Sequence, residues 1–177
     1  MKKVILLLLM VIILFGVSSK YKEDYYIIPE DSIRIRIVPN SNNPEDQYLK
    51  QKVKENIEAS VYSDLKNSKT IENSRNIINS NLNKYDRVIK GVLAKQNSNQ
   101  KHNIDFGYHY FPEKVYKGVK YKEGNYESLL ITLGKGEGDN WWCVLFPPLC
   151  SLEVEENNID DVEYSSYVME MFAKYLK

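Results

Sequence analysis

The sequence is poor in the residues that build metal centres, since it has two cysteines and two histidines among 177 residues. It also lacks an excess of one charge, with 24 basic and 24 acidic side chains, which argues against a strongly basic surface for nucleic acid. A mean hydropathy of -0.46 argues against a polytopic membrane protein. Apolar residues make up 43% of the chain and aromatic residues 12%, which is enough for a real core. We therefore expect one folded domain and predict neither a metal nor a cofactor.

Long apolar runs are absent except for one short run at the N-terminus. Two lysines precede residues 4–17, which carry no charge. A helix of these residues would be about 21 Å long, whereas the hydrocarbon core of a membrane is about 30 Å thick. The pattern is typical of an export signal cleaved near Ser19. An uncleaved anchor is the alternative, because basic residues follow the run. Both interpretations place the rest of the chain outside the membrane.

The next part of the chain has the pattern of a strand followed by two helices. Residues 32–38 alternate three isoleucines with Arg34 and Arg36, as in a half-buried strand. Asn43 is a good N-cap for a helix, with a proline and two acids after it. A second helix is predicted over residues 70–95. The apolar stripes of the two helices are Leu49, Val53, Ile57, Val61 and Leu65, then Ile78, Leu82, Tyr85, Ile89 and Val92.

The second half of the chain returns to a period of two. Strands are predicted over residues 102–111 and 126–133, and residues 115–121 have the pattern of one further extended piece. Residues 141–149 form the densest apolar run, and residues 160–177 place apolar side chains at helical spacing. This order predicts an α+β fold, with a mainly antiparallel sheet of about four to five strands and a helical pair packed on it.

The only thiols are Cys143 and Cys150. In an exported protein such a pair favours a disulfide, and two prolines between them allow the chain to fold back. A loop this short would contribute about 2–3 kcal/mol to stability. Two buried thiols are the alternative. A nucleophilic role is disfavoured, because bulky apolar neighbours flank Cys143 and raise a thiol pKa, and we predict no catalytic residue.

The glycine-rich segment contains Gly134, Gly136 and Gly138. A phosphate cradle requires a helix directly after such a loop, but a strand-like run follows here. A flexible hairpin loop with positive φ at the glycines is the favoured interpretation. The acidic pairs at 155–156 and 160–161 lie in a polar stretch and do not single out the facing carboxylates that a glycosidase needs.

Two segments together are distinctive: residues 28–50 (IPEDSIRIRIVPNSNNPEDQYLK) and residues 129–150 (LLITLGKGEGDNWWCVLFPPLC). Both resemble the stage II sporulation protein R family of endospore-forming bacteria, and the resemblance runs from about residue 28 to residue 152. The resemblance implies a secreted developmental signal without catalytic residues. Together with the sequence patterns, it predicts a signal peptide (1–19), a sporulation-signal domain (20–152) and a C-terminal tail with a helix (153–177).

The resemblance also implies a function. Proteins of this family are made in the forespore and exported into the space between the forespore and mother-cell membranes. There they are thought to activate a membrane-embedded aspartic protease, stage II sporulation protein GA, which processes the sigma-E precursor. No nucleic acid or small-molecule substrate is expected. A secreted cell-wall-associated enzyme or binding module is the alternative function.

A protein of this kind acts by favouring one state of its target. We expect its contact surface at the polar side of the first strand, the turn that follows, the glycine loop and one of the two tryptophans, which face opposite ways on a strand. The alternative is that the arginines merely line a solvated sheet face. The candidate residues are Arg34, Arg36, Asn40, Ser41, Asn42, Gly134, Gly136, Gly138, Asn140, Trp141 and Trp142.

Overall fold

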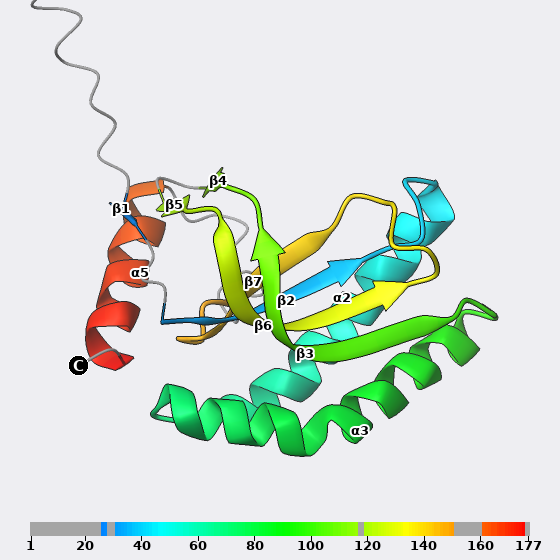
Figure 1. Cartoon of the computed structure of the whole chain (residues 1–177), viewed down its shortest axis with the longest axis horizontal. Helices are drawn as coiled ribbons and strands as arrows, with labels where there is room; N and C mark the ends of the chain where they lie inside the picture. The colour runs from blue at the N-terminus through cyan, green and yellow to red at the C-terminus, as the bar shows by residue number, and fades with distance from the viewer. Residues whose placement is uncertain (1–25, 28–30, 117–118, 151–160, 176–177) are drawn as a thin grey trace, which may run out of the picture.

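The structure, a computed structural model, describes residues 26–27, 31–116, 119–150 and 161–175. The predicted export signal and the acidic pair at 155–156 lie outside these residues. Within the described part of the chain, no helix is both long and apolar enough to cross a membrane. The elements in chain order (Figure 1) are β1 (Tyr26–Ile27), β2 (Ile33–Val38), α2 (Pro44–Leu65), α3 (Ile71–Lys95), β3 (His102–Phe111), β4 (Lys114–Tyr116), β5 (Val119–Tyr121), β6 (Gly124–Leu133), β7 (Trp141–Phe146) and α5 (Asp161–Tyr175).

Four strands form the main sheet in the order β3-β6-β2-β7. β3 pairs with β6 in antiparallel fashion, from His102 opposite Leu133 to Phe111 opposite Gly124, without a register shift. β7 is antiparallel to β2, whereas β2 and β6 run parallel. The prediction of an α+β fold with a mainly antiparallel sheet and a packed helical pair is therefore confirmed, and the parallel pair makes the sheet a mixed one.

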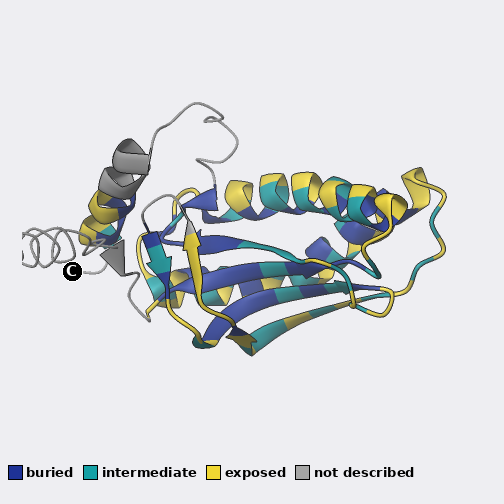
Figure 2. Ribbon diagram, turned by 90° about the horizontal axis from the view of Figure 1, so that it is seen from above, coloured by how far each residue is buried: buried dark blue, intermediate teal, exposed yellow. Residues whose placement is uncertain are grey.

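Helices α2 and α3 cover one face of this sheet, which we call the inner face (Figure 1). Ile33, Ile35 and Ile37 of β2 are completely buried in the apolar cluster that both helices share. All five residues of the predicted α2 stripe are buried as well. Figure 2 shows exposed residues on the side of the helix that turns away from the sheet. The periodicity of the sequence thus correctly predicted this half of the core.

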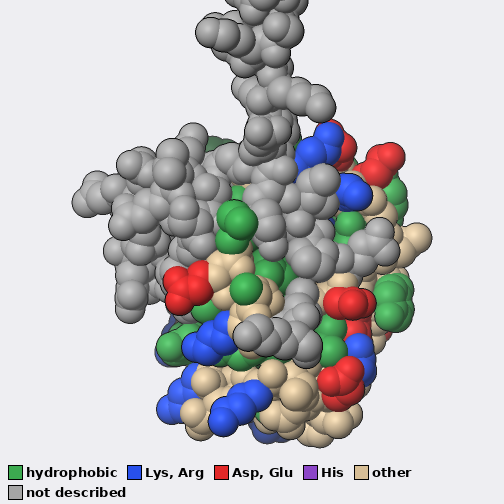
Figure 3. All heavy atoms as spheres, turned by 90° about the vertical axis from the view of Figure 1, so that its left-hand side faces the viewer, with side chains coloured by type: hydrophobic (Ala, Val, Ile, Leu, Met, Phe, Trp, Pro, Cys, Tyr) green, Lys and Arg blue, Asp and Glu red, His purple; other side chains and the backbone are tan. Residues whose placement is uncertain are grey.

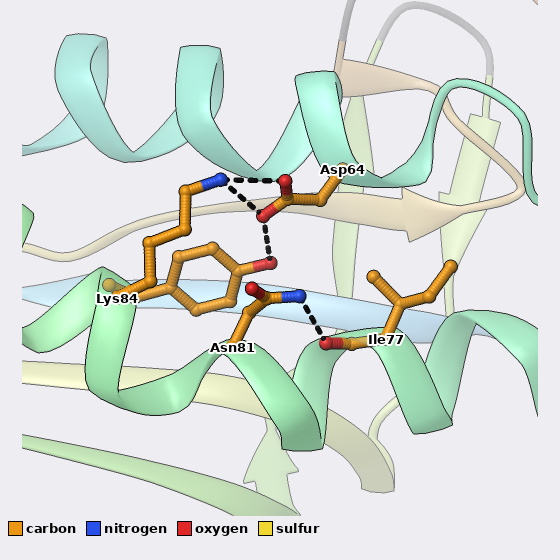
Figure 4. A network of polar contacts seen from close by, with 5 residues as sticks. Asp64, Ile77, Asn81 and Lys84 are labelled. Atoms are coloured by element: carbon orange, nitrogen blue, oxygen red, sulfur yellow. Dashed lines mark hydrogen bonds and ion pairs between the residues drawn. The ribbon is translucent and has the colours of Figure 1, made fainter.

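A polar contact also joins α2 to α3 (Figure 4). The hydroxyl of the buried Tyr85 donates to Asp64 Oδ2 at 3.1 Å, and Lys84 Nζ donates to both oxygens of Asp64 at 2.6 and 2.8 Å. Burial, reinforced by the Asp64 carboxylate, raises the pKa of Tyr85 far above its ordinary value. Tyr85, predicted only as part of an apolar stripe, therefore also links the two helices through its hydroxyl.

A smaller layer of strands lies at one end of the molecule, at the upper left of Figure 1, and Figure 3 is seen from that left-hand side. β4 pairs with β5 in antiparallel fashion and β1 adds to β5 in parallel. The expectation of one extended piece over residues 115–121 is wrong, because β4 and β5 are separate strands that run in opposite directions. Val119 and Tyr121 pack with Val144 of β7 and with α5 in a second apolar cluster. Helix α5 confirms the helical spacing predicted near the C-terminus.

Candidate functional site

Of the predicted contact residues, Arg34, Arg36 and Trp142 lie on the face of the main sheet opposite the helices, which we call the outer face. Trp141 lies on the inner face. Strand register places Arg34 of β2 between Ser128 of β6 and Val144 of β7, and Arg36 beside Trp142. Since side chains alternate across a strand, both arginines leave the sheet on the side away from α2 and α3. The two arginines then differ in what they meet.

Arg34 is completely buried. Its guanidinium carbon lies 3.3 Å from the centroid of the Tyr126 ring, with the rings of Phe111 and Trp142 at 5.1 and 5.3 Å. Among the described residues, none of its three nitrogens has a hydrogen-bond partner. Removal from water lowers the pKa of the guanidinium, although an arginine stays protonated. The expectation of an accessible Arg34 is therefore wrong, because aromatic residues of β3, β6 and β7 lie over it.

Arg36 is only partly buried, and its partners are uncharged. Its Nη1 donates to the backbone carbonyl of Tyr110 at 3.0 Å. The Asn140 amide oxygen, in the orientation that satisfies both groups, accepts from Arg36 Nη2 at 2.7 Å and Nε at 2.9 Å. The structure thus joins two predicted residues that are distant in the sequence. Among the described residues, no carboxylate pairs with Arg34 or Arg36.

Trp141 and Trp142 project to opposite faces of β7, as the sequence predicts. Trp142 lies on the outer face, edge-on to Phe111 at 5.6 Å and to Tyr121 at 4.8 Å between ring centroids. Trp141 packs on the inner cluster, and Lys54 Nζ lies 4.7 Å from its ring centroid. Both indoles stay partly accessible.

The turn after β2 lies against the loop between β6 and β7. Asn40 Oδ1 accepts from the backbone nitrogen of Lys135 at 3.0 Å, and Asn42 Oδ1 accepts from the backbone nitrogen of Asp139 at 2.6 Å. Lys50 of α2 donates to the Asp139 carbonyl at 2.8 Å. The turn after β2 and the glycine-rich loop, predicted as parts of one surface, therefore lie side by side and are held by hydrogen bonds within the protein.

Asp46, in the first turn of α2, organises this junction. Asn40 Nδ2 and Ser41 Oγ donate to its Oδ2 at 2.8 and 2.6 Å, and Gln100 donates to its other oxygen. The bond from Ser41, followed by that from Asn40, holds the pKa of Asp46 below its usual range. Asn43, the expected cap, makes no side-chain cap bond. The sequence pattern indicates Asp46 only as a favourable acid in the first turn of the helix.

The three loop glycines have a structural explanation. Gly134 and Gly136 have φ values of +58° and +70°, which favour glycine, as expected. A Cβ on Gly138 would lie 2.2 Å from the carbonyl oxygen of Ser41. The expectation of a hairpin is wrong, because β2 lies between β6 and β7 in the sheet. The glycines let the loop approach the turn after β2 closely.

Cys143 and Cys150 are buried thiols in this structure. Their sulfurs approach the same acceptor, the carbonyl oxygen of Val144, at 3.9 and 2.9 Å. The sulfurs are therefore neighbours. A disulfide between them in the exported protein stays a prediction.

A hydrogen-bonded row of Asp105, His109 and Ser128 crosses the outer face. His109 Nε2 lies 2.9 Å from Asp105 Oδ2, and His109 Nδ1 lies 2.7 Å from Ser128 Oγ. These residue types also form hydrolase triads. Ser128 is completely buried, so its hydroxyl has no access to a substrate in this state. The row ties β3 to β6, and no signal in the sequence singled out Ser128.

Two further features of the described residues are a cavity and the distribution of side chains that bind metals. A mostly apolar cavity of about 400 Å³ opens between α2 and the segment after β7, lined by Tyr62, Leu145, Pro148 and others. None of the predicted contact residues lines it. Within the described ranges, no three His, Cys, Asp or Glu side chains gather into a metal site.

These observations define an α+β domain that gathers arginines and aromatic rings on one face of a four-stranded sheet. Residues 29–156 match the family described as Stage II sporulation protein R. The chain is 39% identical over 136 residues to Stage II sporulation protein R of Bacillus subtilis (strain 168), a match that covers 77% of this chain and 61% of that protein. The chain therefore belongs to the stage II sporulation protein R family, as the resemblance indicated. No solved structure matches the chain.

Proposed function

We propose that this chain is an exported sporulation signal. It is made in the forespore, crosses into the space between the two membranes, and activates the mother-cell aspartic protease stage II sporulation protein GA. That protease then processes the sigma-E precursor. The observation that carries the proposal is membership of the family over residues 29–156, which include the main sheet and both helices of the inner face.

An activator that performs no chemistry works by differential binding. It must bind the active state of the protease more tightly than the inactive state. A hundredfold preference corresponds to about 2.7 kcal/mol. The proposed contact surface comprises Arg36 and Trp142 at the edge of the outer face and the exposed parts of the two joined loops, which include Asn42, Lys135 and Glu137.

A deletion strain tests this function. Cells without the gene are expected to accumulate unprocessed sigma-E precursor, and the full chain is expected to restore processing. A version without residues 2–19 is expected to fail, because it stays in the forespore. Normal processing in the deletion strain would show that the proposal is wrong.

Purified protein provides a separate test against a wall enzyme. Incubation with peptidoglycan is expected to release no soluble fragments. Sustained release of fragments, together with a defect in wall remodelling in the deletion strain, would favour the enzyme instead.

A further inference from the structure

Three cationic side chains meet around two aromatic rings on the outer face. The guanidinium carbons of Arg34 and Arg36 lie 5.1 and 5.9 Å from the centroid of Phe111. Arg34 also lies 5.3 Å from Trp142, and Lys114 Nζ lies 5.4 Å from the same ring. We call the set of Arg34, Arg36, Lys114, Phe111, Tyr126 and Trp142 the cationic box. Like charges this close repel one another, and the repulsion grows as water is removed.

The described part of the chain supplies no anion to the two arginines. Of the carboxylates on the neighbouring strands, Asp105 lies on the outer face and bonds His109. Glu127 lies on the inner face, where it forms a two-point ion pair with Arg75 of α3 at 2.6 and 2.9 Å. Arg36 is satisfied by uncharged oxygens. Within the described residues, Arg34 has no hydrogen-bond acceptor at any nitrogen.

A buried guanidinium without an acceptor is costly. Stacking on Tyr126 offsets part of that cost, but it leaves every N–H of Arg34 unused. An apolar side chain such as methionine would carry no such penalty. Natural sequences keep a locally unfavourable residue where function requires it, so the unused donors of Arg34 point to a ligand that accepts hydrogen bonds.

We propose that the cationic box binds a carboxylate, carried by an acidic side chain of the partner polypeptide. The inference rests on the proposed function and names the chemistry of the contact. A planar carboxylate accepts two parallel N–H bonds from an arginine fork, which neither a neutral amide nor a hydroxyl can match. Arg, Trp and Tyr together are the residue types that dominate binding energy at protein–protein interfaces, which favours a polypeptide over a small free acid.

Access to Arg34 requires a movement. Arg36 and Trp142 are accessible in part, so an incoming carboxylate meets them first. Tyr121 of β5 packs edge-on to Trp142 at 4.8 Å and lies 6.0 Å from the Arg34 guanidinium carbon. Docking therefore requires the rings of Phe111, Tyr126 and Trp142 that lie over Arg34 to shift, together with Tyr121 of β5, so that Arg34 reaches its acceptor.

The first experiment asks whether the charge of Arg34 serves partner binding or the stability of the fold. Arg34→Met keeps an unbranched side chain, although a shorter one, and removes the charge. If the charge serves binding, the full-chain variant melts at the same or a higher temperature than the wild type and loses activation. A lower melting temperature, with a loss of activation no larger than the loss of folded protein, would overturn the proposal. Arg87→Met is the matched control, because Arg87 is exposed on α3.

The second experiment measures sigma-E precursor processing in sporulating cells. Arg34→Met and Arg36→Met are each expected to slow processing at least tenfold, and Arg87→Met is expected to leave it unchanged. If Arg34→Met does not fold, two other variants test the proposal. Arg36→Met changes a partly exposed residue, and Arg34→Lys keeps the charge but lacks the planar fork, so both are expected to slow processing. Normal processing with Arg36→Met would overturn the carboxylate proposal while a defective deletion strain still supports the activator function.

The third experiment identifies the carboxylate. Overlapping synthetic peptides from the outward-facing segments of the protease are added to the full chain, each beside a copy with Asn or Gln in place of its acids. At least one acidic peptide is expected to raise the melting temperature of the wild type but not of Arg34→Met, and its amide copy is expected to be inactive. Equal effects of both copies, or stabilisation by acetate or peptidoglycan fragments alone, would overturn the assignment to an acidic polypeptide.

Discussion

The two faces of strand β2 are built from adjacent residues and are held in different ways. Ile35 and Arg34 are both completely buried. Ile35 lies in an apolar cluster that both helices share. The three nitrogens of Arg34 lie among aromatic rings and have no hydrogen-bond partner in the described part of the chain. Two equally buried residues therefore contribute to stability with opposite sign. Ile35 on the inner face stabilises the fold, whereas the buried charge of Arg34 on the outer face destabilises it.

The largest effect is expected on the inner face. Ile35→Ala should lower the free energy of unfolding by about 2–5 kcal/mol, because it leaves a cavity in a tightly packed cluster. Urea unfolding of the full chain measures it. Arg34→Met, by contrast, should leave the free energy of unfolding nearly unchanged or raise it. Two neighbouring buried positions would then differ in their effect on stability. An Ile35→Ala cost below about 1 kcal/mol, or a larger cost for Arg34→Met, would contradict this comparison.

Two glycines give the next contrast. Gly138→Ala should destabilise by about 1–3 kcal/mol, because the new Cβ would meet the backbone of Ser41 at 2.2 Å. Gly91, exposed on α3, has nothing within 4 Å of an added Cβ, so Gly91→Ala should stabilise the protein by about 1 kcal/mol. Thermal melts of both variants measure the difference. Equal effects would mean that the loop can move away from the turn after β2.

The inner face could be predicted from the sequence because its signals are local. The period of two in residues 32–38 and the stripe from Leu49 to Leu65 depend only on which residues follow one another, and both sets of apolar residues are buried. The sheet order could not be predicted in the same way. The parallel pairing of β2 with β6 joins segments that no local pattern connects.

The outer face was harder to predict for the same reason. Alternation placed Arg34 correctly on the side away from the isoleucines, but it gave no sign that Phe111 and Tyr126 would lie over it. Both rings reach Arg34 through long-range strand pairing. The segments of the candidate surface were selected by composition and resemblance, whereas the organising role of Asp46 depends on contacts with Asn40, Ser41 and the distant Gln100.

The smallest expected effect on stability is that of Asp46, and it depends on pH. Asp46 belongs to the polar junction between the turn after β2 and the glycine-rich loop, whereas the inner face is apolar. Because hydrogen bonds hold the folded pKa of Asp46 below its unfolded value, the stability it contributes is complete above about pH 4, the unfolded range. It is lost as the pH falls through the lower folded pKa. Asp46→Asn should cost about 1–2 kcal/mol near neutral pH, and its difference from the wild type should shrink in acid.

Chemical unfolding at several pH values measures this difference. Ile35→Ala is the matched control, because it removes no titrating group and its cost should stay constant across the same range. A cost of Asp46→Asn that does not change with pH would mean that the carboxylate is no better stabilised in the folded protein than in the unfolded chain. The bonds from Asn40 and Ser41 would then position the loops without depending on the charge, and the junction would resemble the inner face in its response to acid.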